Sequence, residues 1–142
     1  MTHPMSFGAH IPFVEELGFA ITHFEGGEAT LVYTPRPEHR NSFGVTHGGA
    51  VMTLLDVTMA SAARSVQPDM GMVTIEMKTS FMRGAPGDGS PLTGRGRLLH
   101  RTTKMAFTEA SIFDAQGQLC AHATGTFKFM ARPAPATGAP AA

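Results

Sequence analysis

Residues 41–64 read NSFGVTHGGAVMTLLDVTMASAAR, and this stretch decides the fold. After Gly48-Gly49 comes a run of apolar and small residues that is too long and too rich in helix formers to be a strand. It predicts one helix that runs to about Ser65 and is closed by Pro68. Apolar side chains occur all round this helix, so it must be covered all round. In a chain of 142 residues, the expected cover is a curved sheet.

Asp56 is the one ionisable side chain between His47 and Arg64. It lies in the middle of the predicted helix, where aspartate is a mediocre helix former. A carboxylate without a partner in such surroundings would cost several kcal/mol or take up a proton. Asp56 could face a solvent-filled gap or hold a structural hydrogen bond. We favour a third interpretation, a catalytic carboxylate with a tuned pKa.

The helix entrance carries the sequence His47-Gly48-Gly49. Small residues stand there at the point where the first free backbone N–H groups of a helix face outward. Because these groups and the helix dipole attract negative charge, such an entrance is suited to a developing oxyanion. Close backbone packing or a turn is the alternative explanation for a pair of glycines.

The spacing between Gly48 and Asp56 limits how the two could work together. They are eight positions apart in the sequence. At about 1.5 Å of rise per residue they are separated by about 12 Å along one helix. They can hardly act on one carbonyl from the same helix, so a shared site needs two copies of the chain with antiparallel helices. The spacing therefore predicts a homodimer with two identical sites at its interface.

The rest of the chain predicts an antiparallel sheet wrapped around this helix, an α+β fold in a single domain over residues 1–130. We expect a short helix over Ile11–Leu17 and strands over Phe19–Phe24, Glu28–Tyr33, Gly71–Phe81, Leu92–His100, Met105–Phe113 and from Leu119 to Phe129. The polar stretch from His39 to Thr46 is predicted to be a loop leading into the long helix. The Pro- and Ala-rich residues 131–142 are predicted to be a disordered tail.

Two of these strands alternate clearly enough to predict which side chains share a face. In the strand that starts at Gly71, one face is predicted to carry Val73, Ile75, Met77, Thr79 and Phe81, with Thr74 on the polar face. In the final strand, one face is predicted to carry Leu119, Ala121, Ala123, Gly125, Phe127 and Phe129.

The composition excludes several classes of protein. Eleven basic and eleven acidic side chains give a formal net charge of zero, which argues against nucleic acid or an anionic membrane as the main partner. Asp56 interrupts the only apolar stretch long enough to approach a membrane span, and the N-terminal residues do not form a signal peptide. The single cysteine, Cys120, is predicted to be a buried thiol rather than a nucleophile. We therefore expect a cytoplasmic protein.

Other catalytic motifs are absent from the sequence. It contains no GxSxG, GxGxxG or P-loop, and its seven histidines are scattered without an HExxH pair, so we expect no metal and no cofactor. Ten methionines could give an acyl pocket adaptable walls, although ordinary core filling is the better explanation of them. Arg101 and Lys104 lie in a polar break between two predicted strands. There they could bind the phosphates of coenzyme A or simply be solvated.

The set Asn41, His47-Gly48-Gly49 and Asp56, followed by an apolar helix, resembles the motif of the PaaI-like acyl-CoA thioesterases, which have the hotdog fold. The resemblance extends from about Phe13 to Met130. It implies that Asn41 orients the water or the carbonyl, that His47 shapes the entrance, and that Thr74 supplies a hydroxyl that helps to hold the water. Gly49, with Arg101 and Lys104, would contact the substrate.

The resemblance implies that the chain hydrolyses an acyl-CoA thioester to a free acid and coenzyme A. The backbone N–H of Gly48 would bind the carbonyl oxygen, and Asp56 of the partner would act as general base or as nucleophile. The homodimer could pair further into a homotetramer. Two alternatives stay open: a hotdog acyl-CoA dehydratase or hydratase, and a non-catalytic module that binds acyl-CoA or an acyl carrier.

Overall fold

The computed structural model describes residues 6–133 of the chain. Within these residues, two α-helices and a short 3-10 helix accompany six strands. In chain order the elements are α1 (Pro12–Leu17), β1 (Ala20–Glu25), β2 (Glu28–Tyr33), η1 (Pro37–His39), α2 (Gly48–Arg64), β3 (Gly71–Phe81), β4 (Leu92–Arg101), β5 (Met105–Phe113) and β6 (Leu119–Met130). The predicted strands and the predicted long helix are all present, with ends that differ by one or two residues.

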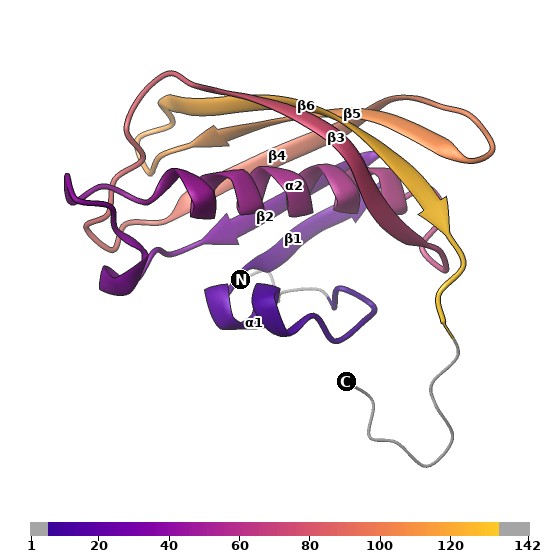
Figure 1. Ribbon diagram of the computed structural model, residues 1–142, viewed down its shortest axis with the longest axis horizontal. Coiled ribbons are helices and arrows are strands. Elements are labelled where there is room, and N and C mark those ends of the chain that lie inside the picture. Colours follow the sequence, from indigo (N-terminus) through magenta and orange to yellow (C-terminus); the bar gives the residue numbers. More distant parts are fainter. Residues whose placement is uncertain (1–5, 134–142) are drawn as a thin grey trace, which may run out of the picture.

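The strands form one antiparallel sheet in the order β1-β2-β4-β5-β6-β3. Figure 1 shows this sheet curving round α2, with α1 below the helix. The core lies between the concave face of the sheet and α2, where Leu54, Leu55 and Met59 of the helix are fully buried. This architecture confirms the predicted antiparallel sheet around one long helix, as expected for a hotdog fold.

One side of α2 differs from the prediction, because the helix is not covered all round within one chain. Half-buried or exposed residues recur along it at helical spacing and form an open strip: Gly49, Met52, Thr53, Asp56, Val57 and Ala60. Met52, which belongs to this strip, is 37% exposed. The sheet encloses only the sides of the helix that face it, so an apolar strip remains for another surface to cover.

Glycines in β4 let the sheet approach α2 closely. A Cβ atom at Gly94 would lie 2.6 Å from the Thr58 hydroxyl oxygen, and one at Gly96 would lie 2.9 Å from the Thr58 carbonyl oxygen. Thr58 itself is fully buried, and its hydroxyl donates a hydrogen bond to the carbonyl oxygen of Leu54. Side chains at these two strand positions would therefore force the helix away from the sheet.

Strand β3 corrects the predicted faces. Its pairing with β6 shifts between Thr74 and Glu76, so Ile75 is an extra residue in a bulge. The strict alternation predicted from the sequence fails at this point, and Thr74 lies on the same side as Met77, against the helix. Val73 and Ile75 are 47% and 54% exposed, although they were predicted to share the buried face. β3 is also an edge strand, with β6 as its one neighbour in the sheet.

Strand β6 follows the prediction over most of its length. The side chains predicted to share one face with Phe127 are buried from Ala121 onward. The first residue, Leu119, is the exception and is 40% exposed, because the pairing with β5 shifts at this point. The shift turns Cys120 into the core instead, where it is fully buried as predicted. Burial raises the pKa of the Cys120 thiol, which disfavours the reactive thiolate.

The two ends of the described chain meet beside α2. α1 begins at Pro12 and ends at Gly18, whose φ of 78° is the left-handed conformation that suits a helix C-cap. At the other end, Arg132 belongs to the predicted tail but donates a hydrogen bond to the carbonyl oxygen of Gly8. Arg132 is therefore held by a contact within the described chain, and residues 134–142 of the predicted tail lie outside the described part. No helix within residues 6–133 is long and apolar enough to cross a membrane.

The close approach of β4 to α2 predicts the cost of a methyl group at Gly96. We expect Gly96→Ala to lower the free energy of unfolding by about 1–3 kcal/mol, because the new Cβ would overlap backbone atoms that cannot rotate away. Urea denaturation followed by circular dichroism measures this change.

Gly94→Ala is the matched control, since its new Cβ would overlap the side-chain hydroxyl of Thr58 rather than the backbone. Thr58→Ala removes both the hydroxyl and the methyl group, so it should recover most of the stability lost in Gly94→Ala but only part of that lost in Gly96→Ala, where the overlap with the Thr58 backbone remains. Equal recovery in both double variants would contradict this packing of helix and strand.

Candidate active site

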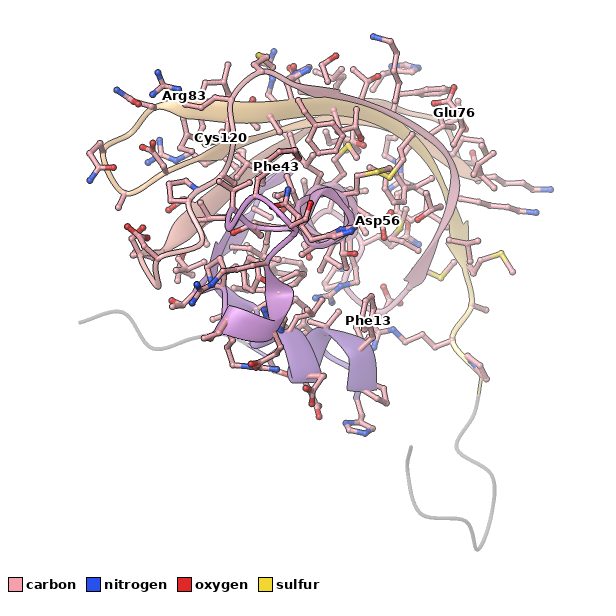
Figure 2. All side chains as sticks on the ribbon, turned by 60° about the vertical axis from the view of Figure 1, so that its left-hand side comes forward. Phe13, Phe43, Asp56, Glu76, Arg83 and Cys120 are labelled. Carbon is pink, nitrogen blue, oxygen red and sulfur yellow. The ribbon has the colours of Figure 1, made fainter. Side chains whose placement is uncertain are left out.

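Asp56 and Thr74 form the polar pair at the centre of the candidate site. Asp56 projects from the open strip of α2, and the Thr74 hydroxyl donates a hydrogen bond of 2.6 Å to its Oδ1 atom. The bulge in β3 makes this contact possible, because it turns Thr74 toward the helix. In Figure 2, Asp56 lies between α2 and β3, with Phe13 of α1 below it. The structure thus brings together two of the residues predicted to be catalytic.

Partial burial changes the chemistry of Asp56. Loss of solvent raises the pKa of its carboxyl group, and the hydrogen bond from Thr74 opposes part of that rise. No cation within residues 6–133 forms an ion pair with Asp56. The carboxylate is therefore a stronger base than an exposed aspartate, while the hydroxyl fixes one oxygen and leaves the other to act.

Asp56 lines a large cavity of about 1360 Å³. Most of its wall is apolar, with contributions from α1, α2 and β3 that include Phe13, Met52, Met72 and Met77. Three methionines thus line this cavity, and their flexible side chains suit an adaptable wall. A cavity of this kind can hold an apolar group next to the carboxylate.

The entrance of α2 is organised by His47, which caps the helix. Its ring Nδ1 accepts a hydrogen bond of 2.9 Å from the backbone N–H of Gly49. A Cβ at position 49 would lie 3.1 Å from that nitrogen, so glycine permits the capping contact. The N–H of Gly49 is engaged by His47, whereas the N–H of Gly48 has no acceptor within residues 6–133. Gly48 therefore presents the available donor at this helix end.

Asn41 shapes the loop before this helix. Its side-chain oxygen accepts hydrogen bonds from the backbone N–H groups of Phe43 and Val45, at 2.9 and 3.3 Å. The carbonyl oxygen of the carboxamide is thus committed to the loop, and the NH₂ group is the part that remains to bind a ligand. Asn41 and Gly48 both line a second, smaller cavity of about 370 Å³.

The two halves of the predicted site are apart within one chain. No described residue lines both cavities: Gly48 belongs to the smaller one and Asp56 to the larger one. This separation agrees with the spacing of about 12 Å expected along one helix. A single chain therefore does not bring the helix entrance and the carboxylate to the same carbonyl group.

Arg101 and Lys104 line neither cavity in the described chain. The Arg101 guanidinium donates a 2.9 Å hydrogen bond to Gln67, just beyond the C-terminal end of α2, and stacks over Phe129. Lys104 is exposed. Both side chains thus lie toward the end of α2 opposite to Gly48. No group of three or more His, Cys, Asp or Glu within residues 6–133 could hold a metal ion.

Two cavity residues were missed by reasoning from the sequence. Arg64 was treated as a helix boundary and Arg132 as part of the tail, yet both line the cavity that contains Asp56. The available signal for Arg64 was a basic residue that directly follows an apolar helical run. No pattern in the sequence links Arg132 to the helix, because the contact is made across most of the chain length.

Known proteins share this sequence pattern. The Thioesterase superfamily profile matches residues 43–121, which include the loop before α2, the whole of α2 and most of the sheet. SSO2140 of Saccharolobus solfataricus, whose name carries a provisional assignment as an esterase, is 32% identical over 78% of each chain. The medium/long-chain acyl-CoA thioesterase YigI of Escherichia coli is 24% identical over 85% of this chain and 87% of its own.

Solved structures share the fold. The conserved protein PA5202 from Pseudomonas aeruginosa superposes with a TM-score of 0.81 and 30% identity, over 89% of this chain and all of its own. The PaaI protein of E. coli, from the phenylacetic acid degradation operon, gives a TM-score of 0.79 with 21% identity over 85% and 86% of the two chains. The predicted resemblance to PaaI-like proteins is confirmed, and the chain belongs to the thioesterase superfamily, with its hotdog fold.

Proposed function

We propose that this protein hydrolyses acyl-CoA thioesters in a site assembled by two copies of the chain. The observation that carries the proposal is the Asp56–Thr74 pair at the wall of a large apolar cavity. A basic carboxylate with one oxygen fixed is suited to activate water, and the cavity is suited to an acyl group. The acyl-CoA thioesterase activity in the name of YigI supports the choice of coenzyme A thioesters.

The second copy supplies the helix entrance. Two antiparallel α2 helices can place Gly48 of each chain beside Asp56 of the other if their two-fold axis passes near Met52, midway between the two positions. Met52 lies in the open strip, and burying it would cover the apolar side of the helix that the sheet leaves open. The exposed edge of β3, with Val73 and Ile75, would extend the same interface.

In this dimer the thioester carbonyl oxygen accepts a hydrogen bond from the Gly48 N–H of the partner subunit. The positive end of the partner's α2 helix stabilises the oxyanion as it forms. The NH₂ group of Asn41, which lines the same cavity as Gly48, can donate to the carbonyl, since the Asn41 side-chain oxygen is already engaged. His47 holds the entrance in shape by capping the helix.

Asp56 can complete the reaction by two routes. As a general base it takes a proton from water while the water oxygen attacks the carbonyl carbon, and the tetrahedral intermediate then releases the coenzyme A thiolate. As a nucleophile it attacks the carbonyl carbon, releases the thiolate and forms a mixed anhydride that water hydrolyses. The raised pKa of Asp56 serves either route, since a more basic carboxylate is both a better proton acceptor and a better nucleophile.

The activity itself is tested with a panel of acyl-CoA thioesters and a chromogenic disulfide that detects free thiol. The one cysteine of the protein is buried, so it adds little background. We expect thiol release from at least one thioester with an apolar acyl group. Binding without release would indicate a non-catalytic module. An enoyl thioester that gains water without releasing thiol would indicate a hydratase.

Asp56→Asn should lower kcat by about 100-fold or more, because the variant can neither accept a proton nor attack the carbonyl. The same change should raise the melting temperature at neutral pH. The folded state raises the pKa of Asp56 above its value in the unfolded state. The stability that Asp56 contributes is therefore present below the unfolded-state pKa and is lost as the pH rises through the folded-state pKa. Steady-state kinetics and thermal denaturation measure the two effects.

Asp69→Asn is the matched control, because Asp69 is exposed in the turn after α2 and lines neither cavity. It should leave both kcat and the melting temperature close to those of the wild type. Near wild-type turnover by Asp56→Asn would show that Asp56 is not catalytic.

Gly48→Pro should lower kcat by about 100-fold or more, because proline removes the N–H that would bind the oxyanion. The fold should persist, since proline is favoured in the first turn of a helix and this N–H has no acceptor within residues 6–133. Gly48→Ala keeps the N–H, and its Cβ would meet the Phe81 ring at an ordinary 3.6 Å, so it should retain most of the activity.

Mixing the two inactive variants tests the assembly of the site. A dimer with one Asp56→Asn chain and one Gly48→Pro chain contains one site with both wild-type residues and one with neither. Co-refolded chains should therefore recover about a quarter of wild-type activity if they assort at random. Failure to recover activity, with both variants folded and dimeric, would show that the two residues do not meet across the interface.

The hydrogen bond to Asp56 predicts a pH effect of Thr74→Val. The Thr74 hydroxyl stabilises the charged carboxylate, so its loss should raise the pKa of Asp56 further. The acidic limb of the profile of log(kcat/KM) against pH should move to higher pH. Thr74→Ser, which keeps a hydroxyl, should leave the limb in place. A shift toward lower pH in Thr74→Val would contradict this role.

A further inference from the structure

Arg64 lies in the cavity wall with an unsatisfied charge. Its side chain is 8% exposed, and its guanidinium stacks over the ring of Phe24. One terminal nitrogen, Nη1, donates to the carbonyl oxygen of Pro68 at 3.2 Å. The other, Nη2, is buried and has no hydrogen-bond partner within residues 6–133. A buried guanidinium N–H without an acceptor is costly and calls for a ligand that accepts.

Arg132 brings a second guanidinium to the same place. One of its terminal nitrogens donates to the carbonyl oxygen of Gly8, while its buried Nε has no partner in the described chain. An atom at the Cβ position of Gly8 would lie 3.2 Å from Nη1 of Arg64 and 3.4 Å from Nη1 and Nη2 of Arg132, so the two guanidinium groups are neighbours. Burial and, to a lesser degree, the Arg132 charge lower the pKa of Arg64.

No carboxylate side chain of this chain neutralises the pair. Neither arginine forms an ion pair with a carboxylate within residues 6–133. Residues 1–5 and 134–142 contain no aspartate or glutamate. Two neighbouring cations, one buried and one half-buried, with no counter-ion among residues 6–133 repel each other and retain part of their desolvation cost. An anion from outside the chain would satisfy the free N–H groups and remove the repulsion.

The arginine pair shares its cavity with Asp56. Arg64 lies eight positions after Asp56 on α2, which corresponds to about 12 Å along the helix axis. The wall between them includes Val57, Ala60 and Met72. Such a wall suits a chain of methylene groups, whereas the amide groups of the pantetheine arm would find few partners there.

We propose that Arg64 and Arg132 bind a carboxylate at the far end of the acyl group, so that the preferred substrates are coenzyme A thioesters of dicarboxylic acids. The proposal rests on the proposed function, because that function places the thioester carbonyl at Asp56. The methylene chain lies along the apolar wall, and the terminal carboxylate accepts hydrogen bonds from both guanidinium groups. Arg64 and Arg132 are specificity residues here and take no part in the bond cleavage.

Binding of matched analogues tests this site without hydrolysis. S-octyl-CoA and S-(carboxyheptyl)-CoA are thioethers of similar length that differ in the terminal carboxylate, and calorimetry measures their dissociation constants. We expect Arg64→Met to weaken binding of the carboxylated analogue by about 10-fold or more, the usual effect of losing a charge-assisted hydrogen bond. Binding of the octyl analogue should change by less than about two-fold, because Met conserves the apolar stem of the side chain.

Arg132→Gln is a second variant that does not alter the helix, and it should act in the same direction as Arg64→Met. Arg97→Gln is the control, since Arg97 is exposed on β4 and pairs with Glu109 outside the cavity. Equal losses for both analogues would assign the arginines to the coenzyme A phosphates, and no loss for either would assign them a structural role. Either result overturns the proposal.

Hydrolysis of octanoyl-CoA and suberoyl-CoA by the wild type completes the test. Failure to release thiol from these two and from every other thioester of the panel would overturn the proposed function, while the analogue binding would still decide the arginine site. If both are hydrolysed, kcat/KM for suberoyl-CoA should fall about 10-fold or more in Arg64→Met, with little change for octanoyl-CoA. A selective loss confirms the inference, and an equal loss contradicts it.

Discussion

The partly desolvated carboxylate of Asp56 is the constraint on which the rest of the structure depends. A charge on a helix that is otherwise apolar is tolerated only with a partner and some access to solvent or ligand. The Thr74 hydroxyl supplies the partner, and the bulge in β3 turns that hydroxyl toward the helix. The cavity beside Asp56 supplies the access. The strand, the helix and the cavity therefore all contact the Asp56 carboxylate, and the raised pKa of this group follows from its incomplete solvation.

The length of α2 is the reason that the proposed mechanism requires two chains. A helix offers its free N–H groups only at its N-terminal end, whereas Asp56 lies in its middle, where flanking turns can shield it from water. Antiparallel pairing resolves this conflict, because each helix end then meets the middle of the other helix. The open strip around Met52 is consistent with such pairing, since the sheet leaves that side of the helix uncovered. The arrangement would place a positive helix end opposite each carboxylate.

Much of the fold could be predicted from the sequence, because helical and alternating periods are local. The long helix, the strands and the separation of Gly48 from Asp56 follow from spacing alone. The errors came from irregular points: the bulge at Ile75 reverses the faces of β3, and a shift near Cys120 exposes Leu119. A single extra residue changes the side on which every later residue of a strand lies, and no local pattern marks it. The contact of Arg132 with Gly8 was equally unpredictable, since it depends on the whole topology.

The position of Arg64 has a further consequence for selectivity. A cation in the last turn of a helix is stabilised by the negative end of the dipole, which offsets part of the burial cost that lowers the pKa of Arg64. α2 thus carries a carboxylate at its middle and a guanidinium at its C-terminal end, facing one cavity. An apolar wall alone distinguishes chain lengths weakly, by about 0.8 kcal/mol for each methylene. A fixed cation at a fixed distance from Asp56 would add selection by position, because a ligand carboxylate too near or too far forfeits its hydrogen bonds while still being desolvated.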